Sequence, residues 1–431
     1  MKRSPLLVIF ITVFIDLVGF GIVIPVLPFY VEGTKFHAST SMVGLLFASY
    51  SVMQFIFTPI LGRLSDRYGR RPILLISLLG TCVGFLILGF ATTLWMLFVG
   101  RIIDGISGGN ISTAQAYIAD ITTPENRAKG MGMIGAAFGL GFTLGPAIGG
   151  ILSKWDINVL GYHIPGISVP FIFAGCLAFA NAVLLYFTLP ETVTPDHPAR
   201  ASAAAGRWSQ LAAALKQRRL TFVLVIYFLF VVAFSIMTTS FALFTMYRFG
   251  YNASNNGYLF MYVGILGVII QGGLIGRLVK AFGELPLVMV GALLFAASLF
   301  TIPFTGPQTG LLVLLGVGGL FAVGNSLATP SLQTLASKSV GRGEQGGVLG
   351  VTQSAASLAR AVGPSLQSVL IYSAIQTQGH DGQLHNMSDH SLLITFWTAG
   401  GIMFAAFLLA AYFARLHAGD YSQAKVATAD S

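Results

Sequence analysis

Residues 62–72 read Gly-Arg-Leu-Ser-Asp-Arg-Tyr-Gly-Arg-Arg-Pro, and residues 276–286 read Gly-Arg-Leu-Val-Lys-Ala-Phe-Gly-Glu-Leu-Pro. The two stretches align without gaps at an offset of 276 − 62 = 214 positions, and five of their residues are identical. Further along each half, Asn110 matches Asn325. Because each stretch directly follows a long apolar run, we infer a duplicated unit of membrane-spanning helices. In transporters built from such repeats, the substrate site lies between the two copies.

The composition of the chain is that of a membrane protein. Of its 431 residues, 55% are hydrophobic and only 9% are charged, whereas soluble proteins carry roughly 25% charged residues. This composition excludes most soluble classes, and the apolar content also excludes a disordered chain. A membrane-spanning helix needs about 20 apolar residues. Twelve apolar runs are present, at roughly 6–28, 41–62, 73–91, 94–119, 130–152, 168–189, 220–247, 257–279, 285–304, 310–336, 347–372 and 391–414.

The predicted architecture is an all-α integral membrane protein with twelve transmembrane helices in two pseudo-symmetric six-helix bundles. A β-barrel is excluded because its strands alternate over about ten residues, whereas these runs are longer and continuous. The predicted parts are an N-terminal bundle over 1–189, a cytoplasmic linker over 190–219, a C-terminal bundle over 220–416 and a cytoplasmic tail over 417–431.

The basic residues predict the orientation of the chain. With the N-terminus inside, nineteen of the 24 lysines and arginines fall on inner segments and three on outer segments. The other two, Arg101 and Arg360, lie within spans. This positive-inside bias places both termini in the cytoplasm. It also accounts for the net charge of +9 without a nucleic-acid partner.

Four ionisable residues lie inside the predicted spans, where such residues are costly and usually functional. They are Asp16 in span 1, Arg101 and Asp104 in span 4, and Arg360 in span 11. Arg101 and Asp104 are i,i+3 neighbours and within reach of an ion pair. Burial favours the protonated form of a carboxyl and a nearby guanidinium favours the ionised form, so two carboxyls that share one arginine compete for it. We expect Asp16 to carry the proton; a permanent structural network of Asp16, Arg101 and Asp104 is the alternative.

Polar and aromatic side chains share helix faces in the spans expected to surround a cavity. The aromatic series in span 7 also fits packing against other helices or lipid, so its contact with substrate is one of two interpretations. Arg360 favours a substrate with an anionic group. The predicted cavity residues are Tyr50, Gln54, Ser112, Gln115, Tyr227, Phe230, Phe234, Thr238, Asn325, Gln353 and Arg360.

Residues 62–72 resemble the loop signature of the major facilitator superfamily, Gly-x-Leu-x-Asp-Arg-x-Gly-Arg-Arg. The glycine series of span 5, which ends in Gly145-Pro146 and Gly149-Gly150, resembles the motif of its antiporters. Residues 16–28 of span 1 resemble the twelve-span drug:proton antiporters of the tetracycline-efflux type. The resemblance implies alternating access, export of small molecules coupled to protons, a monomer, and a bacterial inner (plasma) membrane.

The resemblance also implies gating residues. Asp66 would belong to a charge latch that closes the inner face, with Arg127 as our candidate partner, and span 5 would flex at its Gly-Pro pair. Anchoring of the loop by positive charge, and close helix packing at the glycines, are the plainer interpretations. The predicted gating residues are Gly62, Asp66, Arg67, Gly69, Arg70, Arg127, Gly145 and Pro146.

The chain departs from the tetracycline-efflux pattern. That type carries an acid in span 3, a histidine in span 8 and an acid in span 9, and none of these is present. We therefore expect coupling in spans 1 and 4 and amphipathic organic compounds or drugs as substrates. A proton-coupled importer of a small anionic metabolite is the alternative.

Other functions have little support in the sequence. It contains no nucleophile elbow or phosphate loop, and the prediction is a protein that is not an enzyme and needs no cofactor or metal. His380, His385 and His390 share one polar loop with Asp381 and Asp389. We expect this loop to be solvated, with a weak metal site as the alternative.

Overall fold

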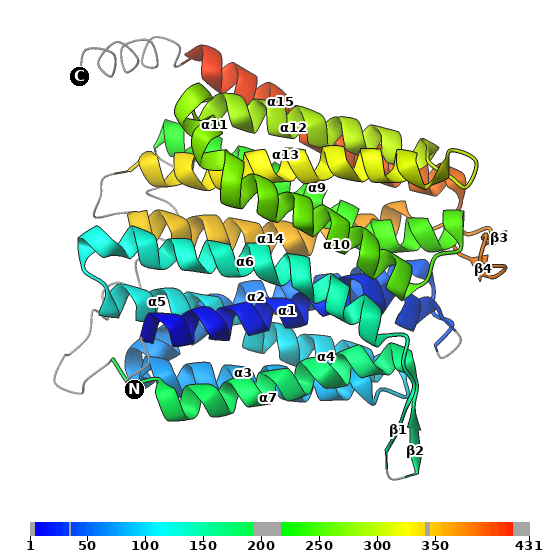
Figure 1. Ribbon diagram of the computed structural model, residues 1–431, viewed down its shortest axis with the longest axis horizontal. Coiled ribbons are helices and arrows are strands. Elements are labelled where there is room, and N and C mark those ends of the chain that lie inside the picture. The colour runs from blue at the N-terminus through cyan, green and yellow to red at the C-terminus, as the bar shows by residue number, and fades with distance from the viewer. Residues whose placement is uncertain (1–4, 34–35, 160, 193–216, 341–344, 417–431) are drawn as a thin grey trace.

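The computed structural model is a bundle of long helices packed side by side (Figure 1). The structure describes residues 5–33, 36–159, 161–192, 217–340 and 345–416. Among these residues, ten helical stretches have the length and composition to cross a membrane. Two further helical spans, over residues 94–121 and 345–370, complete the predicted twelve. Most of the linker and the tail, 193–216 and 417–431, lie outside the described residues.

The N-terminal half forms six spans, the fourth of which is interrupted. A 3₁₀ turn divides it, so that α4 and α5 are separate helices joined by Gly108–Asn110. Thr93 caps α4, because its side chain accepts a hydrogen bond from the Met96 N–H. The elements are α1 (Pro5–Glu32), α2 (Thr40–Tyr68), α3 (Arg70–Gly89), α4 (Leu94–Ser107), η1 (Gly108–Asn110), α5 (Ile111–Ile121), α6 (Pro124–Leu152), β1 (Ile157–Val159), β2 (Tyr162–Ile164), η2 (Gly166–Ser168) and α7 (Val169–Thr188).

The C-terminal half repeats this plan, and its helices begin and end within a few residues of the predicted runs. Its second span contains a π-helical segment, η3, a feature that often marks functional sites. The elements are α9 (Arg218–Phe249), α10 (Ala253–Ile269), η3 (Ile270–Leu274), α11 (Ile275–Phe282), α12 (Glu284–Thr301), η4 (Ile302–Phe304), α13 (Gly310–Lys338), α14 (Gln345–Leu370), β3 (Thr377–Gln378), β4 (Leu384–His385) and α15 (Asp389–Leu416).

The bundle has two distinct ends. The start of α1 and the end of α15 lie at one end, which we call the terminal end (left in Figure 1). The antiparallel hairpins β1–β2 and β3–β4 lie at the other, which we call the hairpin end. In the β3–β4 loop the prediction of a solvated segment is wrong for His385, which is 4% exposed because α1 of the other half covers it.

The two halves are in close contact toward the hairpin end. A Cβ on Gly150 of α6 would lie 2.6 Å from the Cα of Gly257 in α10. Within the N-terminal half, a Cβ on Gly145 would lie 2.6 Å from the Val18 carbonyl oxygen and 2.7 Å from the Cα of Gly21. Small residues thus allow α6 to pack backbone to backbone on α1 and α10, as in other membrane helices.

The same helices diverge toward the terminal end. A Cβ on Gly135 of α6, or on Gly272 of η3, which continues α10, would meet no atom of the described chain within 4 Å. The opening between α6 and α10 therefore lies on the terminal side of the contacts near Gly150. The structure is closed at the hairpin end and open at the terminal end.

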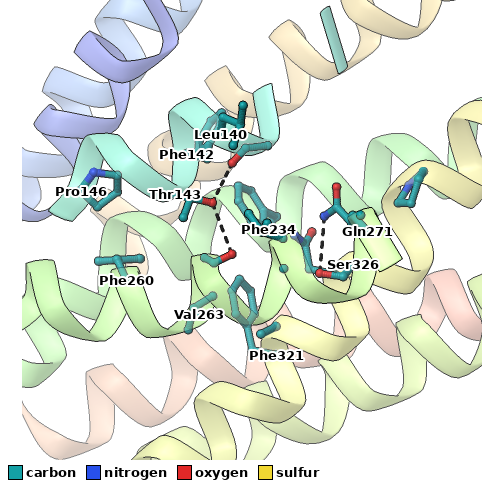
Figure 2. Close-up of a pocket in the computed structure, with 18 of the residues that line it drawn as sticks. Leu140, Phe142, Thr143, Pro146, Phe234, Phe260, Val263, Gln271, Phe321 and Ser326 are labelled. Atoms are coloured by element: carbon teal, nitrogen blue, oxygen red, sulfur yellow. Dashed lines mark hydrogen bonds between the residues drawn. The ribbon is translucent and has the colours of Figure 1, made fainter. Parts of the chain in front are cut away.

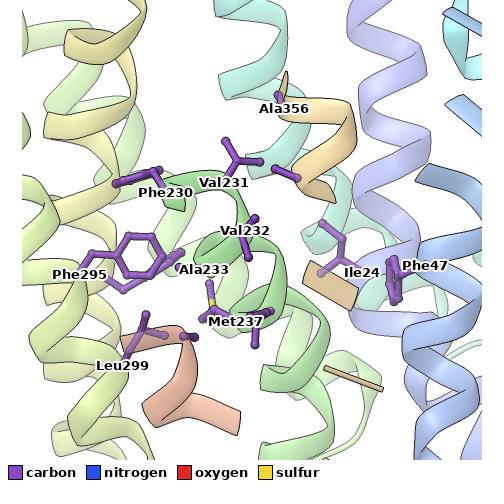
Figure 3. Close-up of a cluster of buried hydrophobic side chains, with 14 of the residues drawn as sticks. Ile24, Phe47, Phe230, Val231, Val232, Ala233, Met237, Phe295, Leu299 and Ala356 are labelled. Carbon is purple, nitrogen blue, oxygen red and sulfur yellow. The ribbon is translucent and has the colours of Figure 1, made fainter. Parts of the chain in front are cut away.

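The apolar core extends across both halves. In Figure 3, side chains of α9 such as Val232 and Met237 lie between Phe295 of α12 on one side and Ile24 and Phe47 of α1 and α2 on the other. All five side chains are less than 5% exposed. Side chains of α9 therefore contact both halves, while the most extensive packing between the halves is that of α6 on α10 and of α2 on α14.

Candidate functional site

Arg101 and Asp104 form an ion pair inside α4. The Arg101 Nη1 donates to Asp104 Oδ2 over 2.9 Å, and the Arg101 side chain is 0% exposed. The guanidinium carbon lies 4.2 Å from the ring centre of Tyr50 and 5.8 Å from that of Phe47. Within the described chain, Arg101 Nε and Nη2 have no hydrogen-bond partner. The aromatic rings therefore provide a cation–π environment on the sides that the carboxylate leaves open.

Asp16 does not form the contact with Arg101 that we expected. Within the described chain, Arg101 forms its ion pair with Asp104, its i,i+3 neighbour, and Asp16 takes part in no ion pair. Asp16 lies near Asn110 and Asp104. Asp16 is partly exposed, whereas Arg101 and Asp104 are buried. Asn110 is the last residue of the 3₁₀ turn η1, and sequence spacing gave no signal that it lies near Asp16.

Three of the predicted cavity residues instead join α2 to the α4–α5 span. Gln54 Nε2 donates to the Tyr50 hydroxyl over 3.0 Å and to the Gly108 carbonyl over 2.9 Å. The Ser112 hydroxyl donates to the Thr58 carbonyl over 3.1 Å. These bonds hold the walls around Arg101 and Asp104. Gln115 in α5 is partly exposed and does not line the two cavities described next.

The larger cavity has a volume of about 490 Å³ and lies between α6, α9, α10 with η3, and α13 (Figure 2). Phe234, Phe260 and Phe321 supply aromatic surface, and Phe234 stacks on Phe321 with ring centres 6.0 Å apart. None of the lining residues is charged. Polar groups are contributed by Thr143, Thr238, Gln271, Asn325 and Ser326.

Three hydrogen bonds organise the polar groups of the larger cavity (Figure 2). Gln271 Nε2 donates to the Ser326 hydroxyl over 3.4 Å, which joins η3 to α13. The Thr143 hydroxyl lies 2.7 Å from the Gly139 carbonyl oxygen and 3.4 Å from that of Gly264, and so links the two halves. An apolar cavity with a few oriented polar groups suits a small organic ligand.

A smaller cavity adjoins the first, and one of the side chains that line it is positively charged. It has a volume of about 20 Å³, and its lining includes Arg360 of α14. Phe234 and Thr238 line both cavities. Arg360 Nη2 donates to the Ser357 hydroxyl over 3.3 Å. Among the described residues no carboxylate lies within ion-pair distance of Arg360, so its charge is available to a ligand.

The structure thus brings together four of the predicted cavity residues: Phe234, Thr238, Asn325 and Arg360. Phe230 packs on Phe295 with ring centres 5.3 Å apart and is enclosed in the core. Tyr227 is buried and Gln353 is partly buried, and neither lines a cavity in this conformation. Gln271 and Ser326 were missed by the sequence reasoning, although the Gln-Gly-Gly break in an apolar run was a signal.

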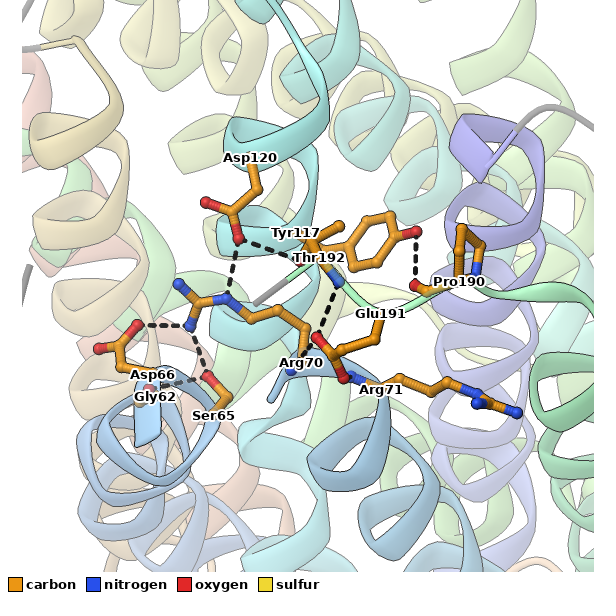
Figure 4. Close-up of polar contacts among 10 residues, drawn as sticks. All are labelled: Gly62, Ser65, Asp66, Arg70, Arg71, Tyr117, Asp120, Pro190, Glu191 and Thr192. Atoms are coloured by element: carbon orange, nitrogen blue, oxygen red, sulfur yellow. Dashed lines mark hydrogen bonds and ion pairs between the residues drawn. The ribbon is translucent and has the colours of Figure 1, made fainter. Parts of the chain in front are cut away.

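At the terminal end, Arg70 is the centre of a charge network (Figure 4). Its Nη1 contacts Asp66 Oδ1 over 2.5 Å and donates to the Ser65 hydroxyl over 2.7 Å. Its Nε donates to Asp120 Oδ2 over 3.1 Å. Arg70 therefore ties the end of α2 to the end of α5. Asp66 was predicted, but Asp120 was not, because it lies 50 residues away from Arg70.

The same network holds the start of α3. The Arg70 and Arg71 N–H groups donate to the two Glu191 carboxylate oxygens over 2.9 and 3.0 Å, which places an anion at a helix N-terminus. Gly69 has φ +103°, and a side chain there would meet the Glu191 carboxylate at 2.5 Å. The Gly62 carbonyl accepts from the Ser65 hydroxyl. Gly69 is thus required both by its backbone conformation and by the close approach of Glu191.

The other four predicted gating positions lie away from this network or outside the described side chains. Arg67 lies over the Tyr68 ring, 5.3 Å from its centre. The side chain of Arg127 lies outside the described residues, so its pairing with Asp66 stays a prediction. Gly145 and Pro146 lie in α6 where it packs on α1.

The C-terminal half has the reverse charge order at the corresponding place. Glu284, which aligns with Arg70, forms an ion pair with Lys338 at the end of α13. The repeat therefore preserves an ion pair between the start of its third span and the end of its fourth while exchanging the signs.

Comparisons with known proteins find relatives over almost the whole chain. The chain is 33% identical to the tetracycline resistance protein, class H, of Pasteurella multocida, over 96% of each protein. It is 29% identical to multidrug resistance protein 2 of Bacillus subtilis (strain 168), over 86% of this chain and 89% of that protein. The crystal structure of the human organic anion transporter MFSD10 (TETRAN) superposes with a TM-score of 0.68 at 25% identity, over 95% and 99% of the two chains. The family description "Major Facilitator Superfamily" matches residues 9–364, and the chain belongs to this superfamily.

Proposed function

We propose that the protein is a proton-coupled secondary transporter that exports amphipathic organic compounds by alternating access. The observation that carries the proposal is the cavity between the halves, which is closed at the hairpin end and lies beside diverging helices at the terminal end. Arg360 lines the smaller cavity beside it, whereas Asp16, Arg101 and Asp104 line neither cavity; transporters use ionisable groups within their spans to couple ions to substrate. The resistance proteins among the relatives favour export. The importer of a small anionic metabolite has less support.

The cavity lining suggests the class of substrate. Aromatic rings such as Phe234 and Phe321 suit a flat or bulky apolar body, and amides such as Asn325 suit its polar groups. Arg360 lies at the adjoining cavity without a carboxylate partner among the described residues. An amphipathic compound with an anionic group therefore fits the two cavities together. The printed description of the human neighbour as an organic anion transporter is in keeping with this class.

The proposed cycle moves one proton against one substrate. Asp16 takes up a proton from the hairpin side when that side is open, and the substrate leaves. With its charge removed, the carboxyl no longer repels Asp104, and the cavity turns to the terminal side. There the proton leaves and the next substrate binds. A proton moving down 100 mV supplies about 2.3 kcal/mol, which sustains roughly a 50-fold substrate gradient.

The distribution of basic residues assigns the terminal end to the cytoplasm. In this orientation the structure is the inward-open state, both chain ends are cytoplasmic, and the charge network around Arg70 lies at the inner face. The protein acts in a bacterial inner (plasma) membrane as a monomer. Its partners are protons, the small-molecule substrate and the lipid bilayer, and it does not act as an enzyme.

The test is proton release from everted membrane vesicles that hold a respiratory pH gradient. Amphipathic cations, neutral drugs and organic anions are added in turn to vesicles with the wild type, with Asp16→Asn and with Asp156→Asn. Asp156 is an exposed residue at the hairpin end and serves as the matched control. We expect one substrate class to collapse the gradient with the wild type and with Asp156→Asn but not with Asp16→Asn.

Each other result has a definite meaning. If no compound changes the gradient, antiport is wrong, and uptake assays with anionic metabolites take its place. If the response persists in Asp16→Asn, antiport stands, but the proton role of Asp16 is wrong and moves to Asp104.

A further inference from the structure

Glu32, His385 and Asp381 form a cluster at the hairpin end that joins the two halves of the protein. His385 Nδ1 lies 2.8 Å from Glu32 Oε2, at the end of α1. His385 Nε2 lies 2.9 Å from Asp381 Oδ2 and 3.0 Å from Asp381 Oδ1, in the β3–β4 loop. The side chains are 3%, 4% and 16% exposed for His385, Glu32 and Asp381. Residues 353 positions apart are thus in direct contact within a nearly closed site.

The imidazole faces two carboxylates and no cation of the described chain. On its remaining side, the Tyr247 ring of α9 meets it edge-on, with ring centres 6.0 Å apart. The Tyr247 hydroxyl is engaged with the Thr377 hydroxyl at 3.0 Å. Beyond Tyr247, the next residue of α9, Arg248, is already paired with Asp389 of α15. The other ionisable groups of these loops are His37, His380 and His390, which are exposed, and Lys35, which lies outside the described residues.

The chemistry of the ring decides its protonation. A neutral imidazole has one N–H donor and an imidazolium has two, so only the imidazolium donates to both carboxylates. Burial by itself lowers the pKa of His385, but the hydrogen bonds and charges of Glu32 and Asp381 outweigh it and raise that pKa above its usual range. Because the two carboxylates contact opposite nitrogens, they do not converge on a metal ion.

We propose that Glu32, His385 and Asp381 form an external proton-binding site that latches the hairpin end closed. The proposal rests on the alternating access proposed above. When the hairpin end opens, the end of α1 moves away from the β3–β4 loop, so His385 loses Glu32 and both groups return to water. The open state therefore binds this proton more weakly than the closed state does.

Closure of the hairpin end consequently takes up a proton from the external side. The closed state is favoured fully at a pH below the pKa of His385 in the open state. It is weakened as the pH rises through the higher pKa of the closed state. External acidity thus drives the change to the inward-open state once substrate has left. This proton returns to the external side at the next opening, so it adds no transported charge.

Distances between spin labels across the hairpin end test the latch. The labels are placed by Thr92→Cys, between α3 and α4, and by Gln308→Cys, between α12 and α13, where both side chains are exposed. Cys82→Ala and Cys176→Ala remove the two native thiols, which are both free. The full chain is measured in lipid nanodiscs from about pH 5.5 to about pH 8.5, a range that brackets histidine titration.

We expect a short distance to dominate in the wild type at low pH, and the ratio of long to short distances to rise about tenfold across the range, as the loss of a charge-assisted hydrogen bond predicts. His385→Gln should show the long distance already at low pH and lose most of the pH response. Glu32→Gln should do the same, and it replaces His385→Gln in the test if His385→Gln does not fold. His380→Gln, in the same loop but exposed, should behave as the wild type.

Failure of the latch can be told apart from failure of alternating access. Two distances with an unchanged pH response in His385→Gln and Glu32→Gln would overturn the latch and leave alternating access intact. A single distance in every variant at every pH would overturn both proposals.

Discussion

The Arg101 Nη1 donates to Asp104 Oδ2 over 2.9 Å, and both side chains are almost completely withdrawn from solvent. Within the described chain, Asp16 forms no ion pair with Arg101 or with any other basic residue. One buried carboxyl is therefore held in an ion pair while the other is not, and this asymmetry underlies the proton role proposed for Asp16.

The ion pair of α4 predicts non-additive stability effects. Asp104→Asn leaves the Arg101 charge buried without its counter-ion, so we expect a loss of about 3–5 kcal/mol, as for other broken buried pairs. Arg101→Gln combined with Asp104→Asn removes both charges and should cost clearly less than the sum of the single changes. Thermal and denaturant unfolding in detergent measure this. Additive losses would mean that the pair contributes no coupling.

Close packing of α6 on α1 predicts opposite effects for two glycines of one helix. A Cβ on Gly145 would lie 2.6 Å from the Val18 carbonyl oxygen, whereas a Cβ on Gly135 meets no atom of the described chain within 4 Å. Gly145→Ala should therefore destabilise the protein by about 1–3 kcal/mol through overpacking. Gly135→Ala should be neutral or stabilising because alanine favours the helix. The unfolding midpoints of the two variants test this difference in stability. Equal shifts of the two midpoints would contradict the packing argument.

The reversed charge order of the two halves predicts a rescue. Arg70→Glu places a carboxylate beside Asp66 and Asp120, and Asp120→Lys removes the partner of Arg70, so each change should strongly lower transport. Combined, they recreate the order of Glu284 and Lys338 and should restore part of the activity. The rescue is tested by measuring substrate efflux from whole cells, corrected for the amount of each variant in the membrane. A double variant as inactive as the single ones would contradict a role based on charge pairing.

The Arg360 cation predicts a selective effect on charged substrates. Arg360→Gln removes the charge at the smaller cavity, and we expect about tenfold weaker binding of an organic anion, because one charge-assisted contact is worth about 1.5–3 kcal/mol. A neutral ligand that fills the aromatic cavity should be affected little. Arg360→Lys retains the charge and is the matched control. An equal loss of affinity for both ligands would mean that Arg360 maintains the shape of the site and does not recognise the charge of the ligand.

Several features follow from local sequence. The twelve spans are continuous apolar runs, and their ends were predicted within a few residues because a helix crossing lipid must satisfy its own backbone hydrogen bonds. The Arg101–Asp104 pair follows from helical spacing, and Arg70 and Asp66 follow from the 62–72 signature.

Contacts between distant segments could not be predicted. Asp66 contacts Arg70, whose second partner Asp120 was not foreseen. Stripes of polar residues predicted eleven cavity positions, yet Tyr50 and Gln54 join α2 to α4, because helix rotation within a bundle depends on neighbours that the stripe does not identify.

By itself, the sequence determined the helices, the duplication, the sites of the buried charges and their near neighbours, because these depend on hydropathy and on spacing within one helix. Tertiary structure alone decided which groups meet across the fold, such as Arg70 with Asp120 and Glu32 with His385. It also decided which end of the bundle is closed. The physical reason is that these contacts depend on how whole helices pack and on which of two arrangements the halves adopt. Neither can be predicted from local sequence, because the residues involved are far apart in the chain.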